Sequence, residues 1–253
     1  MDHAATTYAA PEVVEAMLPY FSEKFGNPSS VYGIGQENKA AVDEARAKVA
    51  AAINAEPNEI YFTAGGTESD NWALKGVAFA NIRKGKHIIT TAVEHHAILH
   101  AAEWLQSQGF EVTYLPVDQY GMVSPADVEK AIRPDTILIS VMYANNEVGT
   151  IQPIAEIGAI ARAHGIYFHT DAVQAVGHVP IDVKAEHIDM LSLSGHKFYG
   201  PKGIGVLYIR RGVRIQNLLH GGSQESRPRA GTENVAGIGG LGAAIERAVE
   251  AMP

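Results

Sequence analysis

Residues 60–82 read IYFTAGGTESDNWALKGVAFANI, and this stretch decides the fold class. A short run of β-branched and aromatic residues, Ile60 to Phe62, is followed by a glycine-rich turn and then by a helix-like segment from Glu68 to Ile82. Strand, turn and helix in this order form the repeating unit of an α/β protein. Such a turn also leaves free backbone N–H groups at a helix start, where a phosphate can bind.

The same alternation continues along the chain. Further strands are predicted at 88–91, 112–115, 137–142, 167–170 and 190–193, and further helices at 36–54, 96–108, 125–132 and 153–164. The run 203–209 follows Leu193 too soon for a helical crossover, so this strand pairs antiparallel or is reached by a longer loop. A loop is expected from Leu219 to Asn234, followed by an Ala-rich helix. The sequence therefore predicts an α/β fold with a mainly parallel sheet.

Composition narrows the class of protein. The chain has 253 residues, a formal net charge of −8 and no cysteine. One large domain is expected, and no nucleic-acid partner, because phosphate neutralisation needs clustered Lys and Arg. No apolar run is long enough to cross a bilayer and the first residues lack a signal-peptide pattern, so a cytoplasmic protein without membrane contact is expected. Zero cysteines exclude disulfides, thiolate metal sites and a cysteine nucleophile within this chain.

Polar residues follow several predicted strands, at the edge where ligands bind in open α/β sheets. Thr67 can add its hydroxyl to a phosphate site, although Thr67 and Glu68 are also common in the first turn of a helix. Asp171 can hold a pyridine nitrogen protonated, or else cap the next helix. His169 and Asp171 share one face of their strand and resemble part of a metal triad whose third ligand is not assigned.

Lys197 lies after the predicted strand 190–193, in the segment Ser194-Gly195-His196-Lys197. Desolvation beside a bound cofactor would lower the pKa of its amine and permit attack on an aldehyde. Most lysines are instead solvated surface charges. Lys197 is therefore a candidate for forming a Schiff base, and the strength of this hypothesis depends on which residues lie near it.

Histidines and an asparagine add to this set. His95 can lie flat on an aromatic ring. His96 and His100 have the spacing of zinc ligands on a helix, but Ala97 stands where a metalloprotease needs glutamate, so no metal site is predicted. Asn146 can place an amide near a ring oxygen or a substrate, and its segment otherwise reads as a turn.

The segment Gly237 to Gly242, GIGGLG, has the spacing of a dinucleotide-binding motif. It follows a loop rather than a convincing strand, and no ribose-binding acid stands at the expected distance after it. We therefore interpret these glycines as a helix-packing site.

Motifs spread over nearly the whole chain carry a family resemblance. They are DHAATT (2–7), GNPSS (26–30), GGTESDN (65–71), EHHA (94–97), NNEVGT (145–150), DAVQAVG (171–177), SGHKFYGPKGIG (194–205), HGG (220–222) and RAGTEN (229–234). In this order the chain resembles the class V aminotransferase-like, fold-type-I enzymes of pyridoxal 5'-phosphate (PLP), most of all the cysteine desulfurases of the NifS and IscS type. The resemblance implies a three-layer α/β/α large domain of the PLP-dependent transferase fold over 1–253, with 1–15 as an arm of the small domain or dimer interface.

Roles at the ring follow from the resemblance, position by position. It implies two catalytic residues, Lys197 as the Schiff-base lysine and His95 as the stacking imidazole. Asp171 would pair with the ring nitrogen and Gln174 would hydrogen-bond the phenolic oxygen. Asn146 would lie near the cofactor and the substrate.

Roles at the phosphate follow in the same way. The resemblance implies that Gly66, Thr67, Ser194 and His196 bind the cofactor phosphate. The threonine matching Thr232 reaches the phosphate of the neighbouring subunit in the family, which implies a homodimer with sites at its interface.

The implied reaction converts L-cysteine to L-alanine and passes persulfide sulfur to an iron–sulfur scaffold or another acceptor protein. The family continues past this chain into a small C-terminal domain that supplies the nucleophilic cysteine and a carboxylate-binding arginine. Without a thiolate, this chain alone is not expected to complete desulfuration. Tyr32 also stands where a histidine is common. Another class V aminotransferase or lyase, and a non-catalytic PLP-binding homologue, remain alternatives.

Overall fold

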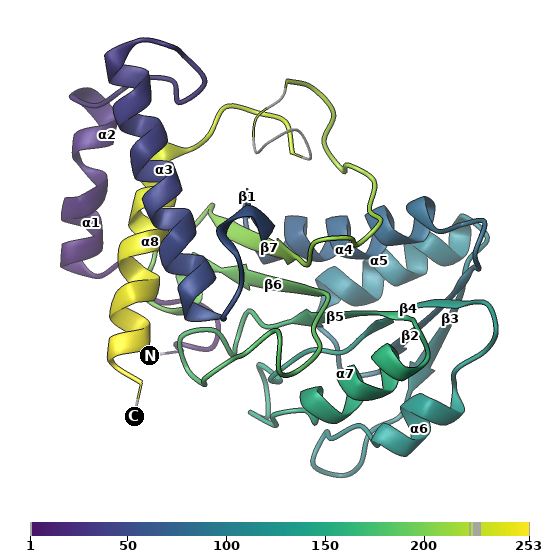
Figure 1. Cartoon of the computed structure of the whole chain (residues 1–253). Helices are drawn as coiled ribbons and strands as arrows, with labels where there is room; N and C mark the ends of the chain where they lie inside the picture. Colours follow the sequence, from purple (N-terminus) through teal and green to yellow (C-terminus); the bar gives the residue numbers. More distant parts are fainter. Residues whose placement is uncertain (1, 223, 225–228, 253) are drawn as a thin grey trace.

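One seven-stranded sheet organises the computed structural model, which describes residues 2–222, 224 and 229–252 (Figure 1). Its strands are β1 (Ile60–Thr63), β2 (His87–Thr91), β3 (Glu111–Leu115), β4 (Thr136–Ser140), β5 (Tyr167–Asp171), β6 (Met190–Ser194) and β7 (Gly205–Ile209). Their order is β1-β7-β6-β5-β4-β2-β3. β7 pairs antiparallel with β1 and β6, and the remaining pairs are parallel. The predicted mixed, mainly parallel sheet is confirmed, and of the two alternatives left open for the last strand the structure shows antiparallel pairing.

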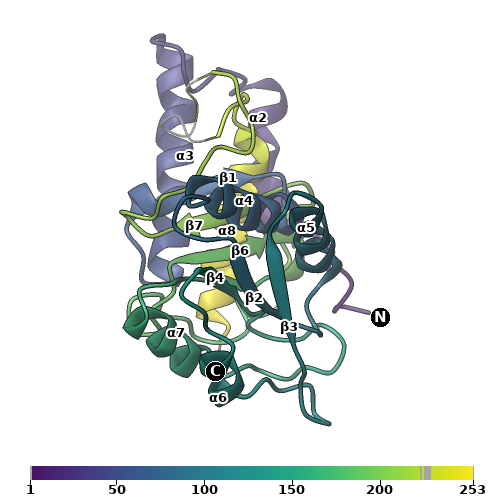
Figure 2. The ribbon, with the colours of Figure 1, turned by 90° about the vertical axis from the view of Figure 1, so that its right-hand side faces the viewer.

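Helices cover both faces of the sheet. They are α1 (Pro11–Met17), α2 (Pro19–Ser22), α3 (Gly33–Ala52), α4 (Gly66–Ala80), α5 (His96–Ser107), α6 (Pro125–Lys130), α7 (Ile154–Ala163) and α8 (Val235–Glu250), with the short 3-10 helices η1 (Pro57–Glu59) and η2 (Gly195–Lys197). Figure 2 shows α4 and α5 side by side, away from α6 and α7. The three-layer α/β/α arrangement is therefore confirmed. The sequence missed α1 and α2, although each begins at a proline, a residue common at helix starts.

Two hydrophobic cores lie on opposite faces of the sheet. Along β7, Val206 and Tyr208 belong to the core shared with α3, α7 and α8, whereas Leu207 and Ile209 belong to the core shared with α4 and α5. Successive side chains of a strand point to opposite faces, so one strand supplies both cores. The sheet is thus buried on both sides, as its mostly apolar strands predict.

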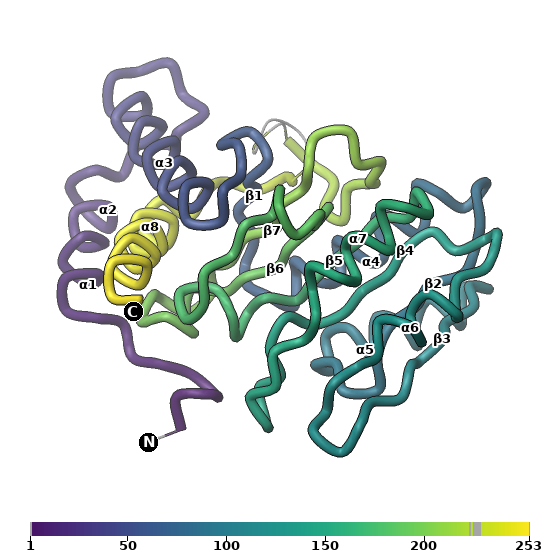
Figure 3. Tube along the Cα trace, turned by 60° about the horizontal axis from the view of Figure 1, so that its bottom comes forward, coloured from purple at the N-terminus to yellow at the C-terminus, as the bar shows by residue number. Residues whose placement is uncertain are grey.

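The glycine-rich segment 237–242 lies within α8, which packs against α1 and α3 (Figure 3). A Cβ on Gly242 would come within 2.8 Å of Ala45 Cβ and 3.0 Å of Ala45 Cα. Absence of a side chain therefore lets α8 approach α3 closely. The helix-packing interpretation is confirmed.

The loop predicted from Leu219 to Asn234 falls partly outside the described residues, which exclude Ser223 and 225–228, as well as Met1 and Pro253. Its described residues form no helix or strand before α8 begins. Among the helices of the described ranges, none combines the length and the apolar character needed to span a membrane.

We expect Gly242→Ala to lower the free energy of unfolding by about 1–3 kcal/mol, because the added methyl overpacks the contact with Ala45. Gly239→Ala is the matched control on the same helix, since its Cβ would lie 3.4 Å from the nearest atom, Tyr20 Cε2. That control should be neutral or stabilising by up to about 1 kcal/mol. Chemical denaturation followed by circular dichroism measures both. Equal stabilities of the two variants would contradict close α3–α8 packing.

Candidate functional site

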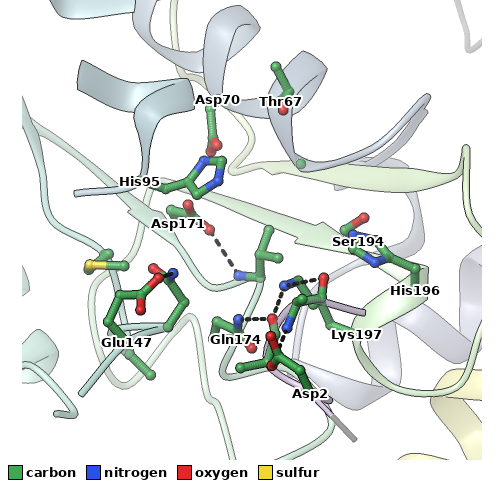
Figure 4. Close-up of a pocket in the computed structure, with 17 residues that line it drawn as sticks. Asp2, Thr67, Asp70, His95, Glu147, Asp171, Gln174, Ser194, His196 and Lys197 are labelled. Carbon is green, nitrogen blue, oxygen red and sulfur yellow. Dashed lines mark hydrogen bonds between the residues drawn. The ribbon is translucent and has the colours of Figure 1, made fainter. Parts of the chain in front are cut away.

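One cavity of about 330 Å³ opens where the parallel strands end (Figure 4). Residues from the turns after β1, β2, β4, β5 and β6 line it, together with the N-terminal segment. The lining consists of Asp2, Ala4, Ala5, Gly66, Thr67, Asp70, His95, Met142, Ala144, Asn146, Glu147, Asp171, Val173, Gln174, Ser194, His196 and Lys197. Of the cofactor-binding residues that the sequence selected, only Thr232 is not in this lining. Thr232 is exposed on the loop before α8.

The start of α4 forms one wall of the cavity. Gly65 adopts a φ of 147°, a conformation that favours glycine. A Cβ on Gly66 would come within 2.7 Å of Val173 Cγ2, so glycine lets the helix start approach the loop after β5. The first N–H groups of a helix have no acceptor within it and can bind an anion. The wall is therefore suited to a phosphate.

Asp171 ends β5 with only 5% of its surface exposed. Its Oδ1 accepts the Val173 N–H at 3.0 Å, so the carboxylate caps the turn that follows rather than a helix. Burial raises the pKa of Asp171, while the Val173 N–H, His95 and Lys197 lower it. A cationic group in the cavity would stabilise the ionised carboxylate.

Lys197 ends η2 and carries the cavity's amine. Its Nζ donates to the carbonyl oxygens of Ala4 and, at 3.0 Å, Ala5. The Gln174 amide donates to the same Ala4 oxygen at 2.8 Å. Burial lowers the pKa of Lys197, partly offset by Asp171 and Asp2. A lowered pKa enlarges the fraction of neutral amine, the nucleophilic form.

Two histidines line the cavity together with the Lys197 amine. His95 is the N-cap of α5, and its Nδ1 accepts the Ala97 N–H at 3.1 Å. In the neutral ring this contact leaves the proton on Nε2. Burial lowers the pKa of His196, as do nearby Lys197 and Lys202, and its Nδ1 lies 3.0 Å from Thr6 Oγ1. His196 is thus a neutral hydrogen-bonding group at pH 7.

The N-terminal segment reaches this site from the opposite end of the chain. The backbone N–H and the hydroxyl of Thr7 both donate to the His196 carbonyl at 2.9 Å. The Tyr199 N–H in turn donates to Thr7 Oγ1 at 2.9 Å. The sequence had not assigned Asp2, Ala4 or Ala5 to the site. No local pattern signals a contact between residues so far apart in the chain.

Two buried acids beside the cavity were also missed. Asp70 is 1% exposed and lies one helical turn after Gly66, a spacing that puts both on the same side of α4. This helical spacing is the sequence pattern that could have identified Asp70 as a residue of the site. Glu94 is 5% exposed and accepts from Thr91 Oγ1 at 2.7 Å and from the Met142 N–H at 2.9 Å. Burial raises the pKa of Glu94 to about 8.

The residues considered as metal ligands have other contacts. His169 Nδ1 lies 2.9 Å from Ser140 Oγ and its Nε2 lies 3.0 Å from Ser192 Oγ. Burial lowers the pKa of His169 to about 3, so the ring is neutral. The rings of His96 and His100 lie 5.2 Å apart on the exposed side of α5. Within the described part of the chain, no cluster of three His, Cys, Asp or Glu residues could hold a metal ion.

Asn146 lies on the turn after β4. Its Nδ2 donates to Glu147 Oε1 at 2.9 Å, and both side chains line the cavity. The side chain of Asn145 fixes this turn by accepting the N–H groups of Glu147 and Val148 at 2.9 and 3.0 Å. The amide of Asn146 therefore lies at the cavity on a turn that the hydrogen bonds of Asn145 stabilise.

Comparison with known proteins places this cavity in a family context. The chain is 69% identical over 248 residues to "Cysteine desulfurase IscS" of Methanosarcina thermophila, covering 98% of this chain and 61% of the relative. It is 64% identical over 253 residues to the protein of the same name from Clostridium botulinum, covering 100% of this chain and 64% of the relative. The chain thus spans somewhat less than two thirds of the length of these relatives.

Solved structures agree with the sequence relatives. A structure titled "NIFS-LIKE PROTEIN" has a TM-score of 0.96 at 45% identity and covers 98% of this chain and 69% of its own. One titled "SspA in complex with cysteine" has a TM-score of 0.95 at 46% identity, and the match covers 100% of this chain and 72% of that chain. The fold is therefore that of the fold-type-I large domain. The family model described as "Aminotransferase class-V" matches residues 1–252, and the chain belongs to the class V aminotransferase family.

Proposed function

We propose that this chain binds pyridoxal 5'-phosphate through Lys197 and forms the cofactor-binding part of a cysteine desulfurase. The observation that carries the proposal is a single cavity lined by the buried Asp171 carboxylate, the Lys197 amine and the glycine-rich start of α4. Carboxylate, amine and anion-binding helix start complement a pyridine nitrogen, an aldehyde and a phosphate. When bound, the cofactor would withdraw electrons from an amino-acid substrate.

The cavity fits this cofactor in size and donor set. Its volume of about 330 Å³ lies in the range of small-molecule sites. A Cβ at position 66 would crowd Val173 Cγ2 at 2.7 Å, so glycine there favours a close approach of the α4 backbone to a phosphate. Thr67, Ser194 and His196 line the same cavity and offer further hydrogen bonds to the phosphate.

Each side chain has a proposed task at the ring. Asp171 would hold the ring nitrogen protonated, and His95 would lie against the ring face. Gln174 would donate to the phenolic oxygen, and Asn146 would contact the cofactor and the substrate. Lys197 would bind the aldehyde carbon and move protons at the substrate, for which its lowered pKa prepares the amine.

L-cysteine is the proposed substrate, because relatives at 64–69% identity are named cysteine desulfurases and a related structure is titled as a complex with cysteine. In the proposed reaction the C–S bond breaks, the sulfur joins a thiolate as a persulfide, and the carbon skeleton leaves as L-alanine. The chain contains no cysteine, so the thiolate must come from another polypeptide segment. An iron–sulfur scaffold or another acceptor protein would then receive the sulfur, in the cytoplasm.

We propose a homodimer as the working form. Thr232 is exposed and lies outside the cavity lining, which is compatible with a contact to the phosphate site of a second copy. Large apolar side chains are also exposed on α2 and the loop after it, namely Phe21, Phe25, Val31 and Tyr32. Such a group of exposed apolar residues is typical of a protein interface.

Lys197→Ala should abolish covalent attachment of the cofactor, because no other amine lines the cavity among the described residues. Borohydride reduction of the PLP-loaded chain, followed by peptide mass mapping, should locate the cofactor on Lys197. Lys39→Ala is the control, since Lys39 is exposed on α3 and pairs with Asp43. A reduced adduct that persists in Lys197→Ala would show that the lysine assignment is wrong.

Asp171→Asn should weaken PLP binding by about 10–100-fold, since a charge-assisted hydrogen bond contributes about 1.5–3 kcal/mol. The reason is loss of the negative charge that stabilises a protonated ring nitrogen. Equilibrium dialysis measures the affinity, and the ¹⁵N shift of ring-labelled PLP reports the protonation. Asp127→Asn, at an exposed carboxylate of α6, is the control. Unchanged affinity and ring protonation would refute the role of Asp171.

The PLP-loaded chain, supplied with L-cysteine, a separate polypeptide bearing a nucleophilic cysteine and a dithiol that reduces the resulting persulfide, should form alanine and sulfide in equal amounts. The chain alone should give no sustained sulfide release, because it lacks a thiolate. Amino-acid analysis and a sulfide assay measure the products. A keto acid in their place would favour another class V aminotransferase or lyase. Absence of any turnover with the second polypeptide would favour a non-catalytic PLP-binding protein.

A further inference from the structure

Asp70 is a buried carboxyl group with little to stabilise a negative charge. It lies in the first turns of α4 and lines the cavity, with 1% of its surface exposed. Its Oδ1 has no hydrogen-bond partner among the described residues. Burial and the neighbouring Asp171 raise the pKa of Asp70 more than the nearby Ser192 hydroxyl lowers it. An ionised carboxylate in such surroundings is costly, because burial removes the water that stabilises it.

The basic side chain paired with Asp70 among the described residues, His169, does not supply a charge. Its Nε2 lies 3.7 Å from Asp70 Oδ1, beyond hydrogen-bonding distance. The ring is fully buried between the hydroxyls of Ser140 and Ser192, and burial holds its pKa near 3. His169 is therefore neutral at pH 7, and no Lys or Arg of the described residues forms an ion pair with Asp70.

Asp171 is much better placed to ionise than Asp70. The Val173 N–H donates to its Oδ1 at 3.0 Å. His95 and Lys197 both favour its charged form. Burial and the neighbouring Asp171 raise the pKa of Asp70 well above its ordinary value, and Glu94 adds to this effect. Of two adjacent buried carboxyls, the one with the better donors takes the charge and the other keeps the proton.

We propose that Asp70 is a positioning residue that remains a neutral carboxylic acid beside Asp171, so that Asp171 carries the negative charge offered to the ring nitrogen. This inference rests on the proposed function, because it assigns Asp171 to a pyridine ring. An ionised Asp70 would repel the charge on Asp171 and favour its protonation, and a protonated Asp171 could not stabilise a protonated ring. The hydrogen bonds from Ser140 and Ser192 fix the His169 ring, whose Nε2 lies 3.7 Å from Asp70 Oδ1.

The pH dependence of stability in the cofactor-free chain tests the charge state of Asp70. A carboxyl whose pKa is raised on folding contributes stability that is complete below the unfolded pKa, about 3.9, and is lost as pH rises toward the folded pKa. The amide of an asparagine at this position would not titrate. The melting temperature of Asp70→Asn minus that of the parent chain should therefore increase between pH 4 and pH 7, by about 3 °C or more.

The change with pH in the melting-temperature difference between Asp70→Asn and the parent chain distinguishes the possible roles of Asp70. A purely structural role would displace the melting temperature of Asp70→Asn by the same amount at every pH. An ionised, stabilising Asp70 would make the difference fall as pH rises. Either of these results overturns the inference. Asp43→Asn, at an exposed carboxylate of α3, is the matched control for loss of a solvated charge.

A direct measurement needs no folded variant. In the cofactor-free chain labelled with ¹³C at aspartate carboxyls, the Asp70 resonance should keep the shift of a protonated acid at pH 7. The shift of an ionised carboxylate would overturn the inference, whether or not the chain binds PLP. Selective labelling of the Ser69–Asp70 peptide bond assigns the resonance.

The PLP-loaded chain then links Asp70 to the ring. With ¹⁵N-labelled cofactor, Asp70→Asn should retain the shift of a protonated ring nitrogen, because asparagine is also neutral. Loss of ring protonation in Asp70→Asn would refute the inference while cofactor binding itself persists. Failure of the parent chain to bind PLP would refute the proposed function, and the carboxyl titration of the cofactor-free chain would still report on Asp70.

Discussion

The site depends on the pairing of β7 between β1 and β6. In this register Gly205 lies opposite both Thr63 and Ser194, so the ends of β1 and β6 meet on either side of one glycine. A Cβ on Gly205 would come within 2.6 Å of the Leu193 carbonyl oxygen and 2.7 Å of Gly65 Cα. The contact brings the start of α4 beside the segment that ends in Lys197. An anion-binding helix and a reactive amine therefore share one cavity.

Burial then determines the chemistry of the charged groups in that cavity. It lowers the pKa of Lys197 and raises the pKa values of Asp171 and Asp70. Each group alone would cost free energy in a dry environment, but together they complement a ligand that brings a cation, an aldehyde and an anion. Glu94 extends this group of acids. The cavity therefore gathers ionisable groups whose pKa values are shifted by burial, which is typical of functional sites.

The N-terminal segment connects the site to the helices at the β1 side of the sheet. Thr7 is tied to His196 and Tyr199, and a few residues later α1 packs on α8. The same segment places the Ala4 carbonyl against Lys197 and Gln174. α8 packs on α1, which continues the N-terminal segment, and on α3, where glycine at 242 allows a close approach. The site is thereby held by both ends of the described chain.

Local patterns in the sequence determined the α/β class, the strands, the helices from α3 onward, and the group of strand-end residues that includes Lys197, Asp171 and Gly66. They did so because strand and helix periodicity, glycine turns and the shared edge of parallel strands are local or general properties. Only the tertiary structure decided that Asp70 lies beside Asp171 and that Ala4 contacts Lys197. These contacts join residues far apart in the chain, by 193 positions for Ala4 and Lys197. Their formation depends on strand order and helix placement, which no short stretch of sequence encodes.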